Sequence, residues 1–169
     1  MQQDIREIYI DGLVNARALE TQAIQLLTRQ VERLENYPEV EQALRRHIQE
    51  SEVQRDRLDQ LLESLGTSNS TIKDMGTALM GNLAAIAHTV APDEVLKNSF
   101  ANYAFEHFEI ASYKALLTLA DMAGHTAAQG PLRESLAEEE RMAEWAGQSL
   151  DAVVRKYAML RTQGETAGV

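Results

Sequence analysis

The sequence contains no cysteine, only three prolines and few aromatic residues. Without cysteine the chain has no disulfide, no thiolate nucleophile, no zinc–thiolate site and no cysteine-ligated iron–sulfur cluster. It also has no run approaching the ~18 apolar residues of a membrane span, and its first residues, MQQDIREIYI, lack the basic and apolar regions of a secretory signal. These absences predict a cytoplasmic protein that does not enter a membrane.

Basic residues are also in the minority, with 16 Lys and Arg against 26 Asp and Glu, which gives a net charge of −10. A chain of this charge is repelled by nucleic-acid phosphates and by anionic lipids, so neither is expected as a partner. Apolar residues make up 44% and charged residues 25%, a globular composition. We expect one domain that spans residues 1–169.

Turn signals divide the chain into four long segments in which apolar residues recur every three or four positions, the period of an α-helix. No strand-like alternation competes with this pattern, so the fold class is all-α. The turn signals lie at Asn36-Tyr37-Pro38, Gly66–Ser70, Ala91-Pro92-Asp93 and Gly124, and the predicted helices span about 4–35, 38–66, 92–123 and 126–161.

Helices of about 28–33 residues are roughly 40–50 Å long and are expected to pack lengthwise as a bundle. Short links join the first two and the last two helices into antiparallel hairpins. The connection 67–91 is apolar and alanine-rich, and it is long enough to cross the bundle as one or two short helices. This is the connectivity of a ferritin-like four-helix bundle.

Each of the four helices carries a glutamate on or beside its apolar face near mid-length: Glu20, Glu50, Glu106 and Glu139. Burying a carboxylate in a bundle core costs several kcal/mol unless it is neutralised or paired. Bound cations supply that compensation, and carboxylate oxygens suit iron or manganese. Glu109 follows Glu106 by three residues, so both side chains lie on one face of the third helix.

The histidine pattern of a di-iron bundle, Glu-x-x-His on two helices, is absent from this chain. The second helix has the reverse order at the same spacing, His47-Ile48-Gln49-Glu50, and the fourth has Glu138-Glu139-Glu140 without a following histidine. His47 is therefore open to three interpretations: a ligand, a partner of a ligand, or an exposed side chain.

The stretch Glu106-His107-Phe108-Glu109-Ile110-Ala111-Ser112-Tyr113 resembles the Glu-His-Tyr-Glu-Ile-Ala-x-Tyr signature of the YciE/YciF-type ferritin-like family, with Phe108 in place of the usual tyrosine. Further similarity lies at Ala18-Leu19-Glu20, at 47–52 and at 135–140. The resemblance implies a rubrerythrin-like bundle associated with stress. It also implies that Glu20, Glu50, Glu106, Glu109 and Glu139 are the metal ligands. We add His47 to this predicted site because of its place three residues before Glu50. Ala143 departs from the family, which commonly has an acidic residue there.

Several of these residues also have an ordinary structural interpretation. Glu20 can pair with Arg17, and Glu138 and Glu140 are expected to face solvent beside a buried Glu139. Tyr103 and Tyr113 are expected as core aromatics. His107 is one position off the glutamate face and is expected to be structural or a partner of a ligand, and the tail 162–169 is expected to fray.

Two functions follow from this sequence. The first is a protein that binds two metal ions, iron or alternatively manganese, with possible oxygen or peroxide chemistry. The second is a structural or stress-protective oligomeric bundle in which the carboxylates are protonated or paired with arginines such as Arg17, Arg45 and Arg46. Long amphipathic helices favour a homodimer in either case. The sequence leaves open whether the protein is an enzyme.

Overall fold

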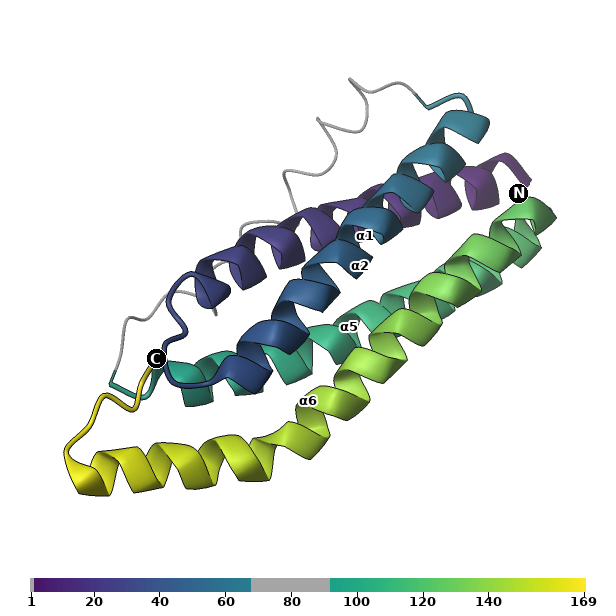
Figure 1. Ribbon diagram of the computed structural model, residues 1–169. Coiled ribbons are helices and arrows are strands. Elements are labelled where there is room, and N and C mark those ends of the chain that lie inside the picture. The colour runs from purple at the N-terminus through teal and green to yellow at the C-terminus, as the bar shows by residue number, and fades with distance from the viewer. Residues whose placement is uncertain (1, 68–91) are drawn as a thin grey trace.

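A computed structural model describes residues 2–67 and 92–169 (Figure 1). This part of the chain contains four long helices and no strand. The ends of the predicted helices agree with the observed ones within about four residues, and residues 68–91 of the predicted crossover lie outside the described residues. The elements are α1 (Gln2–Val31), α2 (Pro38–Ser64), α5 (Glu94–Met122), the 3₁₀ turn η2 (Thr126–Ala128) and α6 (Gln129–Gln163).

The helices form two antiparallel hairpins, α1 with α2 and α5 with α6 (Figure 1). At one end of the bundle the Arg6 guanidinium near the start of α1 donates to the carbonyl of Leu65 after α2, at 2.5 Å. At the other end Arg33, after α1, donates to Glu94 at the start of α5, at 2.8 Å. The connection from α2 to α5 therefore joins opposite ends of the bundle, which confirms the ferritin-like connectivity.

Helix α2 ends at Ser64, and Gly66 follows its C-cap as the stop signal that the sequence predicts. Gly66 has φ +73°, its N–H donates to the carbonyl of Glu63 at 2.9 Å, and the N–H of Thr67 donates to the carbonyl of Leu62 at 3.1 Å. These two bonds form a Schellman motif, whose left-handed residue is most often glycine because it has no Cβ. The motif satisfies carbonyls at the helix end that would otherwise lack partners.

The apolar core has separate clusters on either side of the middle of the bundle. Near the start of α1, Leu13 packs with Leu58 and Leu116. Further along α1, Leu27 packs with Leu44. Apart from Glu94 at the start of α5, the buried polar residues lie in the middle parts of the four helices, so a polar layer separates the two apolar clusters.

The C-terminal tail docks, and the prediction that 162–169 frays was wrong. The Tyr37 hydroxyl donates to the carbonyl of Ala167 at 2.6 Å, and the N–H of Val95 donates to the carbonyl of Gly168 at 2.8 Å. Ala167 is only 3% exposed. The tail therefore joins the α1–α2 turn to the start of α5 through backbone contacts that a periodicity pattern cannot indicate.

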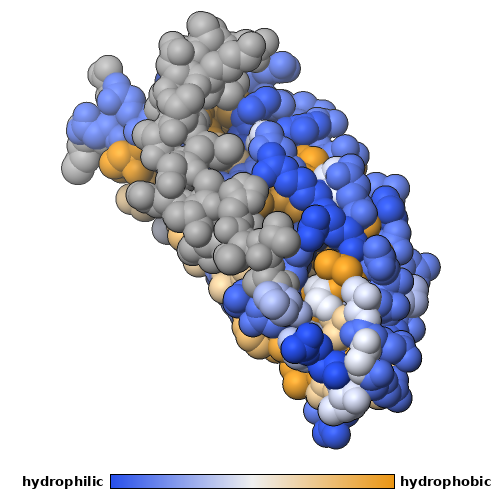
Figure 2. All heavy atoms as spheres, turned by 90° about the vertical axis from the view of Figure 1, so that its left-hand side faces the viewer, coloured by the Kyte–Doolittle hydropathy of each residue, from blue (hydrophilic) through white to orange (hydrophobic). Residues whose placement is uncertain are grey.

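The outer surface carries most of the charge. Figure 2 shows hydrophilic residues over much of the visible face of the described chain, with hydrophobic residues gathered along one flank. None of the described helices is long and apolar enough to cross a membrane.

Candidate metal centre

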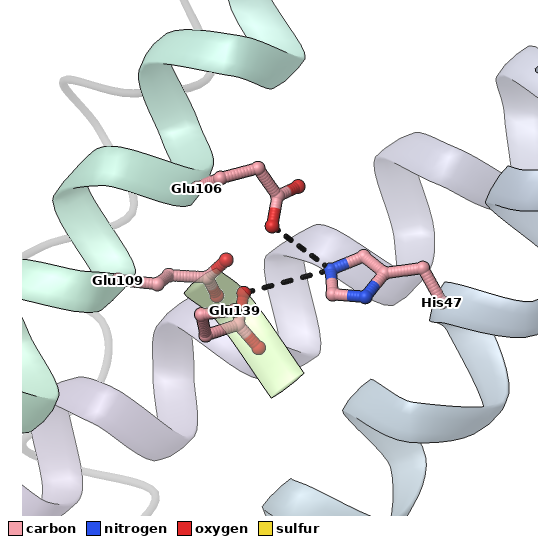
Figure 3. A group of neighbouring side chains, drawn as sticks. All are labelled: His47, Glu106, Glu109 and Glu139. Carbon is pink, nitrogen blue, oxygen red and sulfur yellow. Dashed lines mark ion pairs between the residues drawn. The ribbon is translucent and has the colours of Figure 1, made fainter. Parts of the chain in front are cut away.

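Three helices bring a histidine and three glutamates together in the middle of the bundle (Figure 3). His47 comes from α2, Glu106 and Glu109 from α5, and Glu139 from α6. One potential ligand atom from each residue lies within 4.8 Å of the others. All four side chains are at most 2% exposed, so the group is closed to bulk water.

The imidazole of His47 points its Nε2 atom at the carboxylates. Nε2 lies 3.1 Å from Oε2 of Glu106 and 3.6 Å from Oε2 of Glu139. Neither contact has the geometry of a hydrogen bond, so Nε2 has no hydrogen-bond partner among the described residues. A buried ring nitrogen in this position is available to a ligand.

The carboxylates of Glu109 and Glu139 have no donor among the described residues for any of their four oxygens. Oε2 of Glu106 likewise has none. Ligand atoms of Glu109 and Glu139 lie within 4.8 Å of each other, and when both carboxyl groups are ionised they only accept. Unpaired buried oxygens are costly, so this group requires either protons or cations.

Glu20, from α1, lies beside the same group and is 1% exposed. The hydroxyl of Tyr113 donates to its Oε1 at 2.5 Å, while Oε2 has no partner among the described residues. Burial raises the pKa of Glu20 to about 7, although the Tyr113 hydrogen bond and His47 act in the opposite direction. The structure thus places all four helices around one polar layer, and Tyr113 is buried as predicted.

The other pKa shifts in the layer show the same competition. Burial raises the pKa of Glu109 and of Glu139 well above the ordinary range, and neighbouring carboxylates add to the effect. Burial alone would lower the pKa of His47, but the carboxylates of Glu106, Glu50 and Glu139 outweigh it and raise that pKa. At low pH the layer therefore holds extra protons, which cations would replace.

Glu50 is outside the group. Its side chain is 37% exposed, and its Oε2 lies 3.2 Å from Nδ1 of His47, on the far side of the ring from Glu106. Its other oxygen, Oε1, lies 3.5 Å from Nη2 of Arg141 at the surface. The His47 hydrogen bond lowers the pKa of Glu50, so this carboxylate stays ionised.

The prediction that Glu138 faces solvent was wrong, whereas Glu140 is exposed as expected. Glu138 is 9% exposed and accepts from Arg57 at 2.6 Å and from Gln54 at 3.0 Å. The sequence pattern does not predict that Arg57 and Gln54 contact Glu138. The two residues are one turn apart on α2 and so lie on one face of it, which only weakly indicates that they share an acceptor on a neighbouring helix.

The two aromatic predictions have different outcomes. Tyr103 is 37% exposed, so the expectation of a core residue was wrong there. It packs edge-on against His107, with ring centroids 4.7 Å apart, and its ring lies beside Gly147 of α6. His107 is an exposed residue one turn away from Tyr103 on α5.

A hollow of about 230 Å³ lies between α1 and α5 and extends to Glu106. The hollow exists because small side chains on both helices leave space between larger ones, and its walls are mostly apolar. The lining includes Ala23, Leu27, Ala101, Phe105 and Phe108.

The residues present fit a metal centre. The group offers carboxylate oxygens, one imidazole nitrogen and no sulfur, a donor set suited to iron or manganese. The atoms left without partners, on Glu106, Glu109, Glu139 and His47, are the ones that face one another. All four helices contribute to this layer, as in ferritin-like carboxylate centres, with glutamates from α1, α5 and α6 and a histidine from α2.

Comparisons with known proteins place the chain among similar bundles. A family model described as "Domain of unknown function (DUF892)" matches residues 4–159. Protein YciF of Escherichia coli (strain K12) is 33% identical over 143 residues, covering 80% of this chain and 84% of YciF. The family match includes every residue of the candidate centre.

Solved structures are similar over nearly their whole length. The crystal structure of a protein from Xanthomonas campestris pv. campestris has a TM-score of 0.78 at 30% identity, covering 94% of this chain and 99% of that one. The crystal structure of the E. coli stress protein YciF has a TM-score of 0.72 at 28% identity, covering 90% and 98%. The similarity therefore spans the bundle as a whole.

Proposed function

The chain belongs to the DUF892 family, the YciF-type family, and we propose that it is a metal-binding protein whose bundle holds two divalent ions in its middle layer. The observation that carries the proposal is the group of His47, Glu106, Glu109 and Glu139, buried with their ligand atoms turned toward one another and without partners among the described residues. A layer of this kind is costly unless cations occupy it.

Charge supports two ions rather than one. Glu20, Glu106, Glu109 and Glu139 are each at most 2% exposed. When ionised, these four carboxylates carry four negative charges, which two divalent cations neutralise. The ligands would be these carboxylates and Nε2 of His47.

Iron is the first candidate, because ferritin-like carboxylate bundles bind it, and manganese is the alternative. Bound iron would supply one-electron redox chemistry and the activation of oxygen or peroxide. The chain's own residues bury the layer, exclude bulk water and hold a proton between Tyr113 and Glu20. The apolar hollow that extends to Glu106 supports the approach of a small, uncharged reactant such as dioxygen.

The test is metal binding by chelator-treated protein, measured by calorimetry with Mn²⁺ and by elemental analysis after anaerobic loading with Fe²⁺. We expect two ions per chain and a higher unfolding temperature with metal. Glu139→Gln should abolish binding of at least one ion. Glu140→Gln is the matched control, because this neighbour is exposed and pairs with Lys114. Absence of stoichiometric metal together with no gain in stability would refute the proposal.

The alternative is a structural, stress-protective bundle whose carboxylates stay protonated. The raised pKa values of Glu109 and Glu139, which burial causes, favour it because they favour the protonated forms. Neutralisation by Arg17, Arg45 or Arg46 is not supported, because Arg17 pairs with Asp59, Arg45 pairs with Glu41 and Arg46 is exposed. In this case Glu139→Gln would change neither metal content nor stability in the presence of metal.

The relation to the E. coli stress protein YciF supports a role under stress, and we propose a cytoplasmic location. We also propose a homodimer. Light scattering coupled to gel filtration tests it, and a mass of one chain, 18.9 kDa, would contradict it.

A further inference from the structure

We propose that Glu50 is a positioning residue that fixes the ring of His47 for the metal centre, and that it is not itself a ligand. The inference rests on the proposed metal-binding function and deepens it. It also replaces the role that the family resemblance implies for Glu50.

The two ring nitrogens of His47 face different surroundings. Nδ1 lies 3.2 Å from Oε2 of Glu50, whereas Nε2 lies 3.1 Å from Oε2 of Glu106 inside the buried group. A neutral imidazole carries one N–H. If Nδ1 holds that hydrogen and donates it to Glu50, Nε2 presents its lone pair to the interior, where a ligand is needed.

Neither oxygen of Glu50 is available to the interior. Oε2 contacts Nδ1 of His47, and Oε1 faces Nη2 of Arg141 at 3.5 Å. The side chain of Glu50 is 37% exposed and that of Arg141 61%, against 1% for His47. The three residues thus form a line from the surface through Glu50 to the ring.

The spacing on α2 makes this contact local. His47 and Glu50 are three residues apart on one helix, so their side chains are neighbours on its surface. Metal-binding histidines commonly donate their second ring N–H to such a carboxylate, which fixes the tautomer and the ring orientation. The reversed order, His before Glu, thereby has a structural role that the usual Glu-x-x-His pattern does not require.

The first readout uses the protein without metal. Nitrogen-15 NMR of histidine-labelled protein, at an alkaline pH where the ring is neutral, reports which nitrogen of His47 carries the hydrogen. We expect Nδ1–H in the wild type and in Glu50→Gln, whose amide oxygen still accepts. In Glu50→Ala we expect a shift toward Nε2–H.

The second readout is calorimetry with Mn²⁺. Glu50→Ala should bind the same number of ions as the wild type with an affinity about 10- to 100-fold lower. Glu50→Gln should retain most of the affinity. Glu52→Ala, an exposed glutamate on the same helix, is the control for loss of charge and should match the wild type.

The outcomes separate the two proposals. Loss of one bound ion in both Glu50 variants would show that Glu50 is a ligand and overturn the inference while leaving the metal-binding function intact. An unchanged tautomer and affinity in Glu50→Ala would also overturn it. If the wild type binds no metal, the proposed function fails and the inference fails with it, whatever tautomer the ring adopts.

Discussion

Glu109 is the residue where burial and charge conflict most directly. Its side chain is 1% exposed, and neither of its oxygens has a donor among the described residues. We predict that Glu109→Gln raises the free energy of unfolding of metal-free protein by about 1 kcal/mol at pH 8, because the amide removes a buried acid. Urea denaturation in the presence of a chelator measures this.

The gain from Glu109→Gln should shrink at pH 5, where the raised pKa of Glu109 leaves the wild-type carboxyl protonated. Glu140→Gln, on the exposed side of α6, should show neither effect. A loss of stability at pH 8 in Glu109→Gln would mean that the carboxylate makes a favourable contact in the absence of metal.

A second residue-scale prediction concerns the buried pair of Arg57 and Glu138. Arg57→Leu removes the cation that lies 2.6 Å from Glu138 and leaves a nearly buried acid without its charged partner. We expect a loss of about 3 kcal/mol in the free energy of unfolding. The double variant Arg57→Leu with Glu138→Leu should recover most of it, as measured by urea denaturation. If the double variant is no more stable than Arg57→Leu alone, the unpaired Glu138 is not the cause of the lost stability.

The sequence predicts well which residues of the centre are buried. It predicts less well which neighbouring residues are buried beside them. Glu20, Glu106 and Glu139 interrupt apolar stripes, and that anomaly identifies them without coordinates. Glu138 is about 100° from Glu139 around α6, and a helical stripe assigns it to solvent. It is buried because α6 packs against both α5 and α2, so the covered arc is wider than one stripe.

At the scale of elements, two glycines at helix ends, Gly66 and Gly130, differ in backbone conformation but both have open space around them. Gly66 has φ +73°, and a Cβ there would meet no atom within 4 Å, so Gly66→Ala incurs only the backbone cost of the left-handed conformation. Gly130 lies within the first turn of α6 without positive φ and also has open space around it. The two substitutions therefore isolate backbone conformation from packing.

We predict opposite signs for this pair. Gly66→Ala should lower the free energy of unfolding by about 1 kcal/mol, and Gly130→Ala should raise it by about 0.5 kcal/mol. Thermal unfolding of both variants at one pH measures the difference. Equal effects in the two variants would show that the end of α2 does not depend on the Schellman motif.

Helix ends were predictable where the chain itself contains the signal. Pro38 and Gly66 mark the limits of α2 to within two residues. The end of α1 at Val31 has no such signal, and the tail depends on Ala167 meeting Tyr37, 130 residues away in sequence. Contacts of that range belong to the tertiary fold, and local patterns do not encode them.

For the molecule as a whole, the bundle and its connectivity were predictable because four amphipathic helices of similar length have few ways to bury their apolar faces. The distribution of roles within the polar layer was not. Glu50 and Glu139 are both glutamates near mid-helix, yet one side chain is 37% exposed and the other fully buried. That difference depends on how the four helices rotate against one another, which periodicity leaves undetermined within tens of degrees.

The whole-molecule prediction is a reversal of pH dependence by metal. Glu20 has a pKa of about 7, and the pKa values of Glu109, Glu139 and His47 are also raised. A group whose pKa is raised by folding stabilises the protein below its unfolded-state pKa, and that stability is lost as pH rises through the folded-state pKa. The sign is the same for the acids and for the histidine.

Metal-free protein should therefore be more stable at pH 5 than at pH 8, by about 3 kcal/mol from Glu20 alone. With saturating Mn²⁺ the dependence should reverse, because the ions bind the deprotonated carboxylates and displace their protons. Denaturation at both pH values, with chelator and with Mn²⁺, measures all four conditions. Chelator-treated protein that is more stable at pH 8 would contradict the raised pKa values. A fall in stability toward pH 8 that Mn²⁺ does not reverse would instead favour the bundle that keeps its carboxyls protonated.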